Sequence, residues 1–329
     1  MKSRIAPVRW TPPPTPAARR PDHLEVEVVA LPGEGPEDTL IDADGSVLTG
    51  LCDGRILRVS ADGRTITTLA DTGGRPLGLE WLPDGKVLVC DANRGLLTLD
   101  QDGRITTLLA EIGGRPLRFC NNAAIADDGT IYFTDSSTRF GIDEWMADLL
   151  EHTSTGSLYR LRPDGEVTQL ATGRAFPNGV ALTGDQKTLI FAETASYGLY
   201  KLDLTAEDAE PELFRSIPGL PDNIARGSDG LIWVAIGSPR NPLLDNLLPK
   251  APVLRQAVWA LPEALKPKAA DVIEIQAYDD AGTLVHDLRG RHARFHMPTG
   301  VRERDGKVWL SSIGTTHLAT FPTPVKDAR

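Results

Sequence analysis

The stretch Asp84-Gly85-Lys86-Val87-Leu88-Val89, with Gly95-Leu96-Leu97-Thr98-Leu99 and then Asp102-Gly103 and Ile105-Thr106-Thr107-Leu108 after it, decides the fold of this chain. An Asp-Gly turn opens an apolar run, a short loop leads to a second run, and another Asp-Gly turn leads to a third. Alternating apolar and β-branched residues between Asp-Gly turns are typical of β-hairpins. The stretch therefore predicts antiparallel strands joined by tight turns.

The same pattern recurs along the chain. Its other units open at Asp44-Gly45, Asp128-Gly129, Gly184-Asp185, Asp229-Gly230 and Asp305-Gly306. Where nothing is inserted, unit starts lie roughly 40 to 45 residues apart, which is the period of a four-stranded propeller blade. Six units predict an all-β fold, a six-bladed β-propeller with two helical insertions. A β-sandwich would give no reason for the repetition.

The chain divides into an N-terminal arm and one domain. Residues 1–22 carry six prolines, at positions 7, 12, 13, 14, 16 and 21, which predicts an extended Pro-rich arm. Residues 23–329 are expected to form a single six-bladed propeller. The run at residues 24–29 is expected to supply the outer strand of the last blade and so close the ring.

Two units are longer than the period requires. Residues 140–150 and 254–261 have helix-like apolar spacing and good helix formers. Insertions on one face of a repeat protein often shape its binding site, so we expect Phe140, Trp145 and Trp259 to form the apolar wall of a substrate pocket. A packing contact or a homodimer interface would explain the same residues.

Composition excludes several classes of function. The chain has 329 residues and a net charge of −10, with no basic run dense enough to follow a phosphate backbone, so nucleic acid is not an expected partner. No signal peptide or membrane-spanning run is present, which predicts a cytoplasmic protein without a membrane span. The three cysteines, Cys52, Cys90 and Cys120, are expected to be inert residues in apolar strands.

Oxygen-bearing side chains recur at the same place in successive units. Asn121, Asn178 and Asp222 each precede an apolar run of their unit. Taken singly, each would be an ordinary turn residue. Arranged around an axis, their oxygens would converge on one point and suit a hard cation such as Ca²⁺.

Five motifs resemble the strictosidine-synthase-like branch of the gluconolactonase/senescence-marker propeller superfamily over roughly residues 30–320. They are Gly35-Pro36-Glu37-Asp38, Tyr132-Phe133-Thr134-Asp135-Ser136-Ser137, Phe176-Pro177-Asn178-Gly179-Val180-Ala181-Leu182, Ala192-Glu193-Thr194 and Leu220-Pro221-Asp222-Asn223-Ile224. The resemblance implies a catalytic divalent cation at the propeller centre, usually Ca²⁺, although Zn²⁺, Mn²⁺ or Mg²⁺ is compatible. It implies the ligands Glu37, Asn121, Asn178 and Asp222. Glu34 is the alternative to Glu37 as the glutamate ligand, and the spacing typical of the family favours Glu37.

The resemblance also implies a reaction. The small-molecule substrate is a lactone or related ester, whose carbonyl the metal polarises while Asp222 acts as base or nucleophile. Asn223 is expected beside the metal in the substrate pocket, and Asp135 and Glu193 are expected to support the ligands. His296 is expected to be a proton shuttle, with a structural histidine as the alternative.

The departures from the superfamily shape this expectation. Leu77 stands where paraoxonases carry a histidine, so their histidine pair is absent. The apolar inserts favour an apolar or aromatic lactone or ester over a sugar lactone. Two other functions stay open: a non-hydrolytic lyase, isomerase or condensing enzyme, and a binding propeller without catalysis whose cation is structural.

Overall fold

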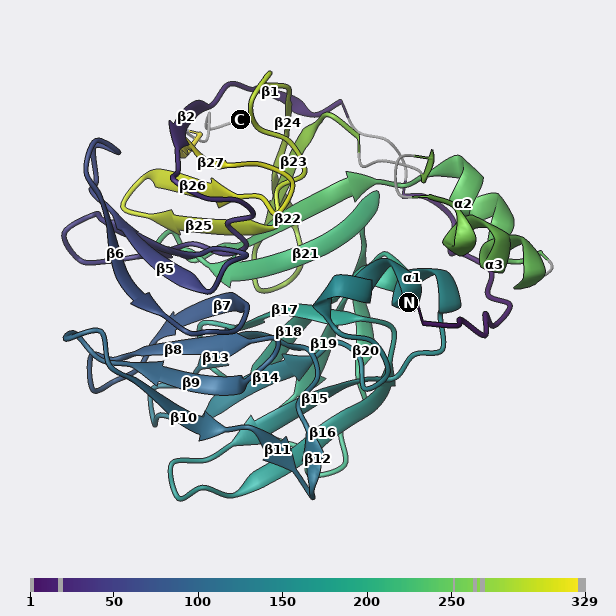
Figure 1. Cartoon of the computed structure of the whole chain (residues 1–329), viewed down its shortest axis with the longest axis horizontal. Helices are drawn as coiled ribbons and strands as arrows, with labels where there is room; N and C mark the ends of the chain where they lie inside the picture. The colour runs from purple at the N-terminus through teal and green to yellow at the C-terminus, as the bar shows by residue number, and fades with distance from the viewer. Residues whose placement is uncertain (1–2, 17–19, 251, 263–264, 267–269, 325–329) are drawn as a thin grey trace.

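The computed structural model describes residues 3–16, 20–250, 252–262, 265–266 and 270–324. Within these residues, six sheets of four or five strands stand around a central axis and form a six-bladed β-propeller (Figure 1). The predicted fold class is confirmed.

The first four blades are each built from four strands that follow one another in the sequence. Blade 1 contains β3 (Leu40–Ile41), β4 (Val47–Gly50), β5 (Arg55–Val59) and β6 (Ile66–Asp71), and blade 2 contains β7 (Pro76–Trp81), β8 (Val87–Asp91), β9 (Gly95–Leu99) and β10 (Ile105–Leu109). A short hairpin of β11 (Glu111–Ile112) and β12 (Arg115–Pro116) precedes blade 3. Blade 3 contains β13 (Cys120–Ile125), β14 (Ile131–Asp135), β15 (Gly156–Leu161) and β16 (Val167–Arg174), and blade 4 contains β17 (Pro177–Leu182), β18 (Thr188–Glu193), β19 (Gly198–Asp203) and β20 (Glu212–Ser216).

The last two blades borrow strands from the N-terminal part of the chain. Blade 5 contains β21 (Gly219–Arg226), β22 (Ile232–Pro239), β23 (Ile273–Tyr278) and β24 (Leu284–Gly290), and β1 (Asp22–Leu24) pairs with β24 in parallel. Blade 6 contains β25 (Gly300–Arg304), β26 (Lys307–Ser311) and β27 (His317–Pro322), with β2 (Glu27–Ala30) antiparallel to β27. The N-terminal run thus supplies the outer strand of the last blade as predicted, and β1 is an addition that the sequence pattern did not indicate.

The innermost strand of each blade lies one element earlier than expected. The Asp-Gly turns that open the units join the first and second strands, and the segments carrying Asn121, Asn178 and Asp222 are themselves innermost strands. Asn178-Gly179 has the composition of a turn but lies inside β17. Glycine is needed there because a Cβ on Gly179 would lie 2.1 Å from the backbone nitrogen of Ile224 in the neighbouring innermost strand.

Apolar side chains pack between neighbouring blades. Trp233 of blade 5 and Phe321 of blade 6, for example, belong to one buried cluster. Cys90 and Cys120 are buried as expected, whereas Cys52 is exposed. Cys52 follows β4 in a turn rather than lying in a strand, so the prediction for this cysteine was wrong.

Both predicted helical insertions are present. The first contains η1 (Ile142–Glu144) and α1 (Trp145–Glu151), between β14 and β15, and the second contains α2 (Pro242–Leu247) and α3 (Pro252–Ala260), between β22 and β23. They follow the second strand of their blade, not the first. Because β14 runs antiparallel to β13, the end of β14 at Asp135 lies beside the start of β13 at Cys120. Both insertions therefore emerge at the end of the channel where the innermost strands begin, and we call η1, α1, α2 and α3 the lid.

The N-terminal arm ties the parts of the lid together. In Figure 1 its purple trace runs beside α1 and α3. The backbone of Val8 donates to Glu151 O (2.8 Å) and that of Trp10 to Leu248 O (3.2 Å), while the Trp259 indole donates to Ser3 O (2.7 Å). No described helix is long and apolar enough to cross a membrane. The homodimer contact considered for these inserts stays a prediction.

Deleting residues 1–13 should loosen the lid without unfolding the propeller, because the arm bonds to both insertions while the blades are held by strand pairing within each sheet and by apolar packing between sheets. Hydrogen exchange of backbone amides in residues 145–151 and 252–260 should accelerate at least tenfold, with blade strands unchanged. A variant lacking only residues 1–2 is the control. Unchanged exchange in both helices after the longer deletion would show that the arm does not hold the lid.

Candidate active site

The innermost strands of blades 2 to 5 share a break in register at one place. Two residues on each innermost strand face a single residue on the second strand, which is a β-bulge. The bulged pairs are Leu77-Gly78, Asn121-Asn122, Asn178-Gly179 and Asp222-Asn223. A bulge re-aims side chains relative to the alternation of a regular strand, and bulges are frequent beside active sites.

The first residue of every bulge lines one cavity of about 650 Å³ beneath the lid. Glu37 of blade 1 and Thr299 of blade 6, which lie just before β3 and β25, line it as well. The structure thus brings Glu37, Asn121, Asn178 and Asp222 to one cavity. Glu34 is exposed and does not line it, which leaves Glu37 as the acidic residue of blade 1.

The floor of the cavity holds oxygen atoms without hydrogen-bond partners. Glu37 Oε2, Asn121 Oδ1 and Asn178 Oδ1 are buried and unpaired. Buried polar atoms in proteins are nearly always paired, so three orphaned acceptors beside the Asp222 carboxylate need a positively charged or hydrogen-donating occupant. Two carboxylates and two amide oxygens form an all-oxygen donor set of the kind that Ca²⁺ takes.

Amides supply half of this donor set. Among the residues that the structure describes, no group of three or more His, Cys, Asp or Glu side chains is placed to hold a metal. The residues on the cavity floor nonetheless fit a hard cation, because their carboxylates supply charge and their amides supply further ligands without adding charge.

Two hydroxyl groups set the orientation of the asparagine amides. Ser136 Oγ donates to Pro177 O (2.7 Å), so its oxygen is left to accept a hydrogen bond from Asn121 Nδ2 (2.8 Å). Thr194 Oγ1 likewise donates to Pro221 O (2.7 Å) and accepts from Asn178 Nδ2 (3.2 Å). A hydroxyl has only one proton to give, so each amide must turn its NH₂ outward and its Oδ1 toward the cavity.

The residues that support the asparagine ligands lie one position after the ones predicted from the sequence. Asp135 accepts a hydrogen bond from the Phe119 backbone (2.9 Å) and Glu193 accepts one from Ser196 (2.7 Å). Within the described residues, neither is hydrogen-bonded to a candidate ligand. The residues that follow them, Ser136 and Thr194, make the supporting contacts that sequence reasoning missed. An acidic residue at a strand end suggested an acceptor, but the hydroxyl oxygens of the next residues are the acceptors that the asparagine amides meet.

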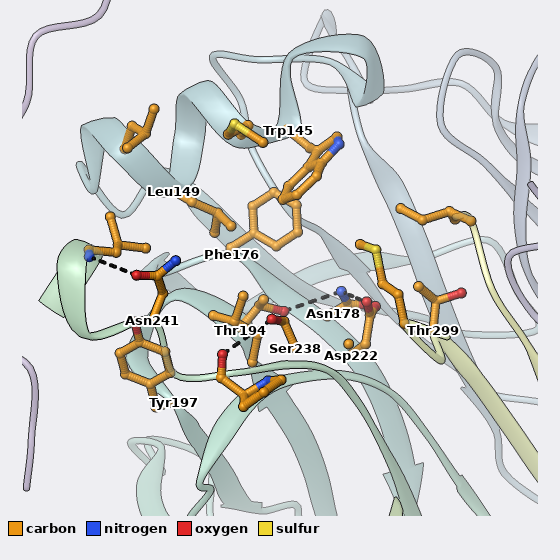
Figure 2. A pocket seen from close by; sticks show the side chains of 18 of the residues that line it. Trp145, Leu149, Phe176, Asn178, Thr194, Tyr197, Asp222, Ser238, Asn241 and Thr299 are labelled. Atoms are coloured by element: carbon orange, nitrogen blue, oxygen red, sulfur yellow. Dashed lines mark hydrogen bonds between the residues drawn. The ribbon is translucent and has the colours of Figure 1, made fainter. Parts of the chain in front are cut away.

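Asn223 lies behind the floor rather than in the pocket. It is buried, does not line the cavity, and donates from Nδ2 to Glu37 Oε1 (2.8 Å). Its expected place as a pocket residue is therefore corrected: as the second residue of its bulge it points toward blade 1. Asn178 donates to Asp222 Oδ1 (2.6 Å), so both carboxylates of the floor are held by an amide (Figure 2).

Burial makes the floor carboxyls hard to ionise. Burial, then the negative charges of Asp222 and Asp38, raise the pKa of Glu37 well above its usual range. Burial also raises the pKa of Asp222 to about 7, although the hydrogen bond from Asn178 acts in the opposite direction. A cation between the two groups would favour their charged forms.

The walls of the cavity are apolar. In Figure 2, Trp145 and Leu149 of α1 lie across the cavity from Asn178 and Asp222. Phe119 and Phe176 line it from the propeller. Leu243, Leu244 and Leu247 of α2 complete the apolar lining. Of the three aromatic residues expected in this wall, Trp145 alone lines the cavity.

Phe140 and Trp259 do not line the cavity, so the prediction that they form its wall was wrong. Both belong to a buried cluster with Ile5, Ala147 and Leu150, so they pack beneath the N-terminal arm. The helical pattern indicates which residues are apolar but not which side of a helix faces the pocket. Here the N-terminal arm covers the outer side of the inserted helices, so apolar residues are needed on the side that faces the arm as well as on the side that faces the cavity.

His296 lines the cavity and precedes blade 6. It is partly buried, and its imidazole has no hydrogen-bond partner within the described part of the chain. The next residue, Met297, has a φ of 54°, a left-handed conformation that is uncommon outside glycine. Its role as a proton shuttle stays a prediction.

A spacing in the sequence would have located the cavity residues. In blades 1 to 5 the cavity residue lies seven positions before the aspartate of the first turn, as in the pairs Glu37 and Asp44, Leu77 and Asp84, Asn121 and Asp128, Asn178 and Asp185, and Asp222 and Asp229. Glu34 does not fit this spacing.

Replacing Thr194 by valine should weaken calcium binding about 10- to 100-fold, since a supporting hydroxyl that orients a ligand is removed without loss of volume. Thr194→Ser keeps the hydroxyl and should bind nearly as well as the unaltered chain. Calorimetric titration with CaCl₂ measures both. Equal affinity of the valine and serine variants would exclude the proposed orientation of Asn178.

The metal-free protein should become less stable as the pH rises from about 4 to about 8. Asp222 titrates at about 7 in the folded chain against an ordinary value of 3.8, so it holds its proton more tightly when folded and its contribution is lost as the pH passes 7. Thermal unfolding in EDTA should show a smaller decline for Asp222→Asn than for the control Asp164→Asn, an exposed turn residue. Identical slopes for the two variants would contradict this.

Sequence comparisons agree with the resemblance. Residues 49–241 match the model of the SMP-30/Gluconolactonase/LRE-like region, and residues 24–59 match that of the N-terminal part of strictosidine synthase-like proteins. Protein STRICTOSIDINE SYNTHASE-LIKE 6 of Arabidopsis thaliana is 34% identical over 310 residues, covering 88% of this chain and 81% of that protein. Protein STRICTOSIDINE SYNTHASE-LIKE 13 of the same plant is 32% identical over 214 residues, 63% of this chain, and the match spans half (50%) of that relative.

Solved structures share the fold. A gluconolactonase from Xanthomonas campestris superposes with a TM-score of 0.66 at 20% identity, covering 91% of this chain and 90% of the other. The calcium-binding protein regucalcin from Agrobacterium tumefaciens gives 0.59 at 17% identity, covering 88% and 90%. The chain belongs to the SMP-30/gluconolactonase-like propeller family, in its strictosidine-synthase-like branch.

Proposed function

We propose that this chain is a Ca²⁺-dependent hydrolase that opens a lactone or related ester in the cavity beneath the lid. The observation that carries the proposal is the set of three unpaired buried oxygens, on Glu37, Asn121 and Asn178, in the cavity that Asp222 also lines. They are costly to leave without a partner, and a cation pairs all of them at once.

The donor set bears on the choice of metal. All four candidate ligands offer oxygen. Hard cations such as Ca²⁺, Mg²⁺ and Mn²⁺ prefer such ligands, whereas Zn²⁺ prefers sites that include nitrogen or sulfur. A calcium-binding regucalcin among the structures that share the fold supports the same choice.

In the proposed reaction, this chain's residues position the ester and move the protons. A bound divalent cation supplies Lewis-acid polarisation of a carbonyl oxygen. Asp222 either takes a proton from the water that attacks the acyl carbon or attacks that carbon itself. In the second case a water molecule then cleaves the anhydride between Asp222 and the acyl group, which releases the acid and regenerates the carboxylate. The new carbon–oxygen bond forms as the ester or ring bond breaks, and His296 delivers a proton to the departing oxygen.

The apolar lining of the cavity favours an apolar substrate. Its walls are formed mainly by apolar side chains from the lid and the propeller, leucine being the commonest of them. A sugar lactone would bring several hydroxyl groups that need partners, and an apolar wall leaves them unpaired. We therefore propose an apolar or aromatic lactone or ester.

Calorimetric titration with CaCl₂ and hydrolysis of an aryl ester and an alkyl-substituted lactone test the proposal on the same samples. Asp222→Ala should lose turnover at least a hundredfold and Asn178→Ala should lose calcium affinity, while the control Asp164→Asn behaves like the unaltered chain. Full turnover of Asp222→Ala would refute the mechanism. Calcium binding without turnover on any lactone or ester would favour a structural cation in a binding propeller.

Isotope labelling separates hydrolysis from the non-hydrolytic alternative that the strictosidine-synthase-like relatives suggest. In H₂¹⁸O a hydrolase incorporates one labelled oxygen into the carboxylate product. A lyase, isomerase or condensing enzyme forms products whose acyl oxygens stay unlabelled, and that result would replace our proposal.

A further inference from the structure

A cationic side chain joins three innermost segments of the propeller next to the residues of the cavity floor. Arg302 of β25 donates from Nε to Thr39 O (3.0 Å) and from Nη2 to Leu79 O (2.9 Å). Its guanidinium also pairs with the carboxylates of Asp38 (3.3 Å) and Glu80 (2.5 Å). A side chain of blade 6 is thus bound to blades 1 and 2 at the propeller axis.

The four oxygen-bearing groups that accept from Arg302 are of the kinds that bind metal ions. Two backbone carbonyls and two carboxylates surround one positive centre, and the side chain of Asp38 is only 1% exposed. Carbonyl and carboxylate oxygens in this proportion are ligands that Ca²⁺ takes in proteins. What stands at their centre in this chain is a guanidinium, not a metal.

The rest of the Asp38 environment consists of hydrogen-bond donors. Its Oδ1 accepts from the Thr39 backbone (2.8 Å), and its Oδ2 accepts from the Leu79 backbone (3.2 Å) and Asn122 Nδ2 (3.5 Å). These donors are neutral, so the positive charge that balances the buried carboxylate of Asp38 comes from Arg302. Removing one member of a buried ion pair leaves an uncompensated charge, which is strongly destabilising.

The site is also reachable from the side away from the lid. A second cavity of about 240 Å³ is lined by Glu80 and Arg302. An ion could enter there without passing the larger cavity under the lid.

We propose that the Arg302 guanidinium occupies a second cation site, in the channel, and holds the propeller axis together without a metal. The chain then takes a divalent ion at the cavity floor alone. Replacing the guanidinium by a small side chain should uncover a Ca²⁺ site made of Asp38, Glu80 and the carbonyls of Thr39 and Leu79. The inference does not depend on hydrolysis.

Calorimetric titration of Arg302→Ala with CaCl₂ tests the inference. The unaltered chain should bind one Ca²⁺ and Arg302→Ala two, whereas Arg302→Lys, which keeps a cation, should bind one. Arg302→Ala/Glu80→Gln should lose the new site. An ordinary structural ion pair predicts one ion for all of these proteins, and that outcome would overturn the proposal.

Two further measurements keep the outcome decisive. In EDTA the melting temperature of Arg302→Ala should fall by about 10 °C, and CaCl₂ should restore it by more than it shifts the unaltered chain. If Arg302→Ala does not fold in EDTA, recovery of the native fold in CaCl₂, but not in NaCl of equal ionic strength, supports the proposal. Failure to recover in CaCl₂ counts against it.

The double variant Arg302→Ala/Asp222→Ala separates the two sites. It should still bind one Ca²⁺ in the channel even though the site at the cavity floor is disabled. If it binds none while Arg302→Ala binds one, only the site at the cavity floor takes calcium, and the channel proposal fails while the proposed function stands.

Discussion

A break of register in the innermost strands determines what the propeller can carry at its centre. A regular strand would aim alternate side chains at the axis and the others into the neighbouring blade. The bulge gives two consecutive residues separate tasks: the first faces the cavity, and the second meets the next innermost strand. Where the strands crowd, the second residue is glycine, as at Gly179, whose Cβ would collide with Ile224. Where there is room it is asparagine, and Asn122 accepts a hydrogen bond from Val180 (3.1 Å) while Asn223 holds Glu37.

The centre is organised before any ligand arrives. Hydroxyl groups at Ser136 and Thr194 point two amide oxygens at the cavity, and Asn223 and Asn178 hold the two carboxylates. Each buried acceptor without a partner costs about 1–3 kcal/mol. The fold tolerates that cost because the blades around the centre are tightly packed and a cation can relieve it. Such preorganisation would let the proposed cation bind with little rearrangement.

The fold followed from the sequence because its signals are local and repeated. Asp-Gly turns and alternating runs are visible in any single unit, and six copies make the period plain. The innermost strands were harder to place, since Asn178-Gly179 has the composition of a turn and reveals itself as a strand only beside Ile224. The metal-binding candidates were found through the resemblance and their recurrence at blade spacing. Phe140 and Trp259 were misplaced because their position depends on the N-terminal arm, a contact between residues far apart in the sequence.

Ring closure sets the order in which this chain can fold while it is being synthesised. The last blade consists of β25, β26 and β27 together with β2, and β1 completes the sheet of blade 5. Ribosomes add about 5–20 residues per second, so β2 waits roughly 15 to 60 seconds for its partner strand. During that interval the first strands of the chain have no sheet to join, and blade 1 stands at an open edge. β2 is therefore synthesised long before β27, and the propeller becomes a closed ring only after β27 has left the ribosome.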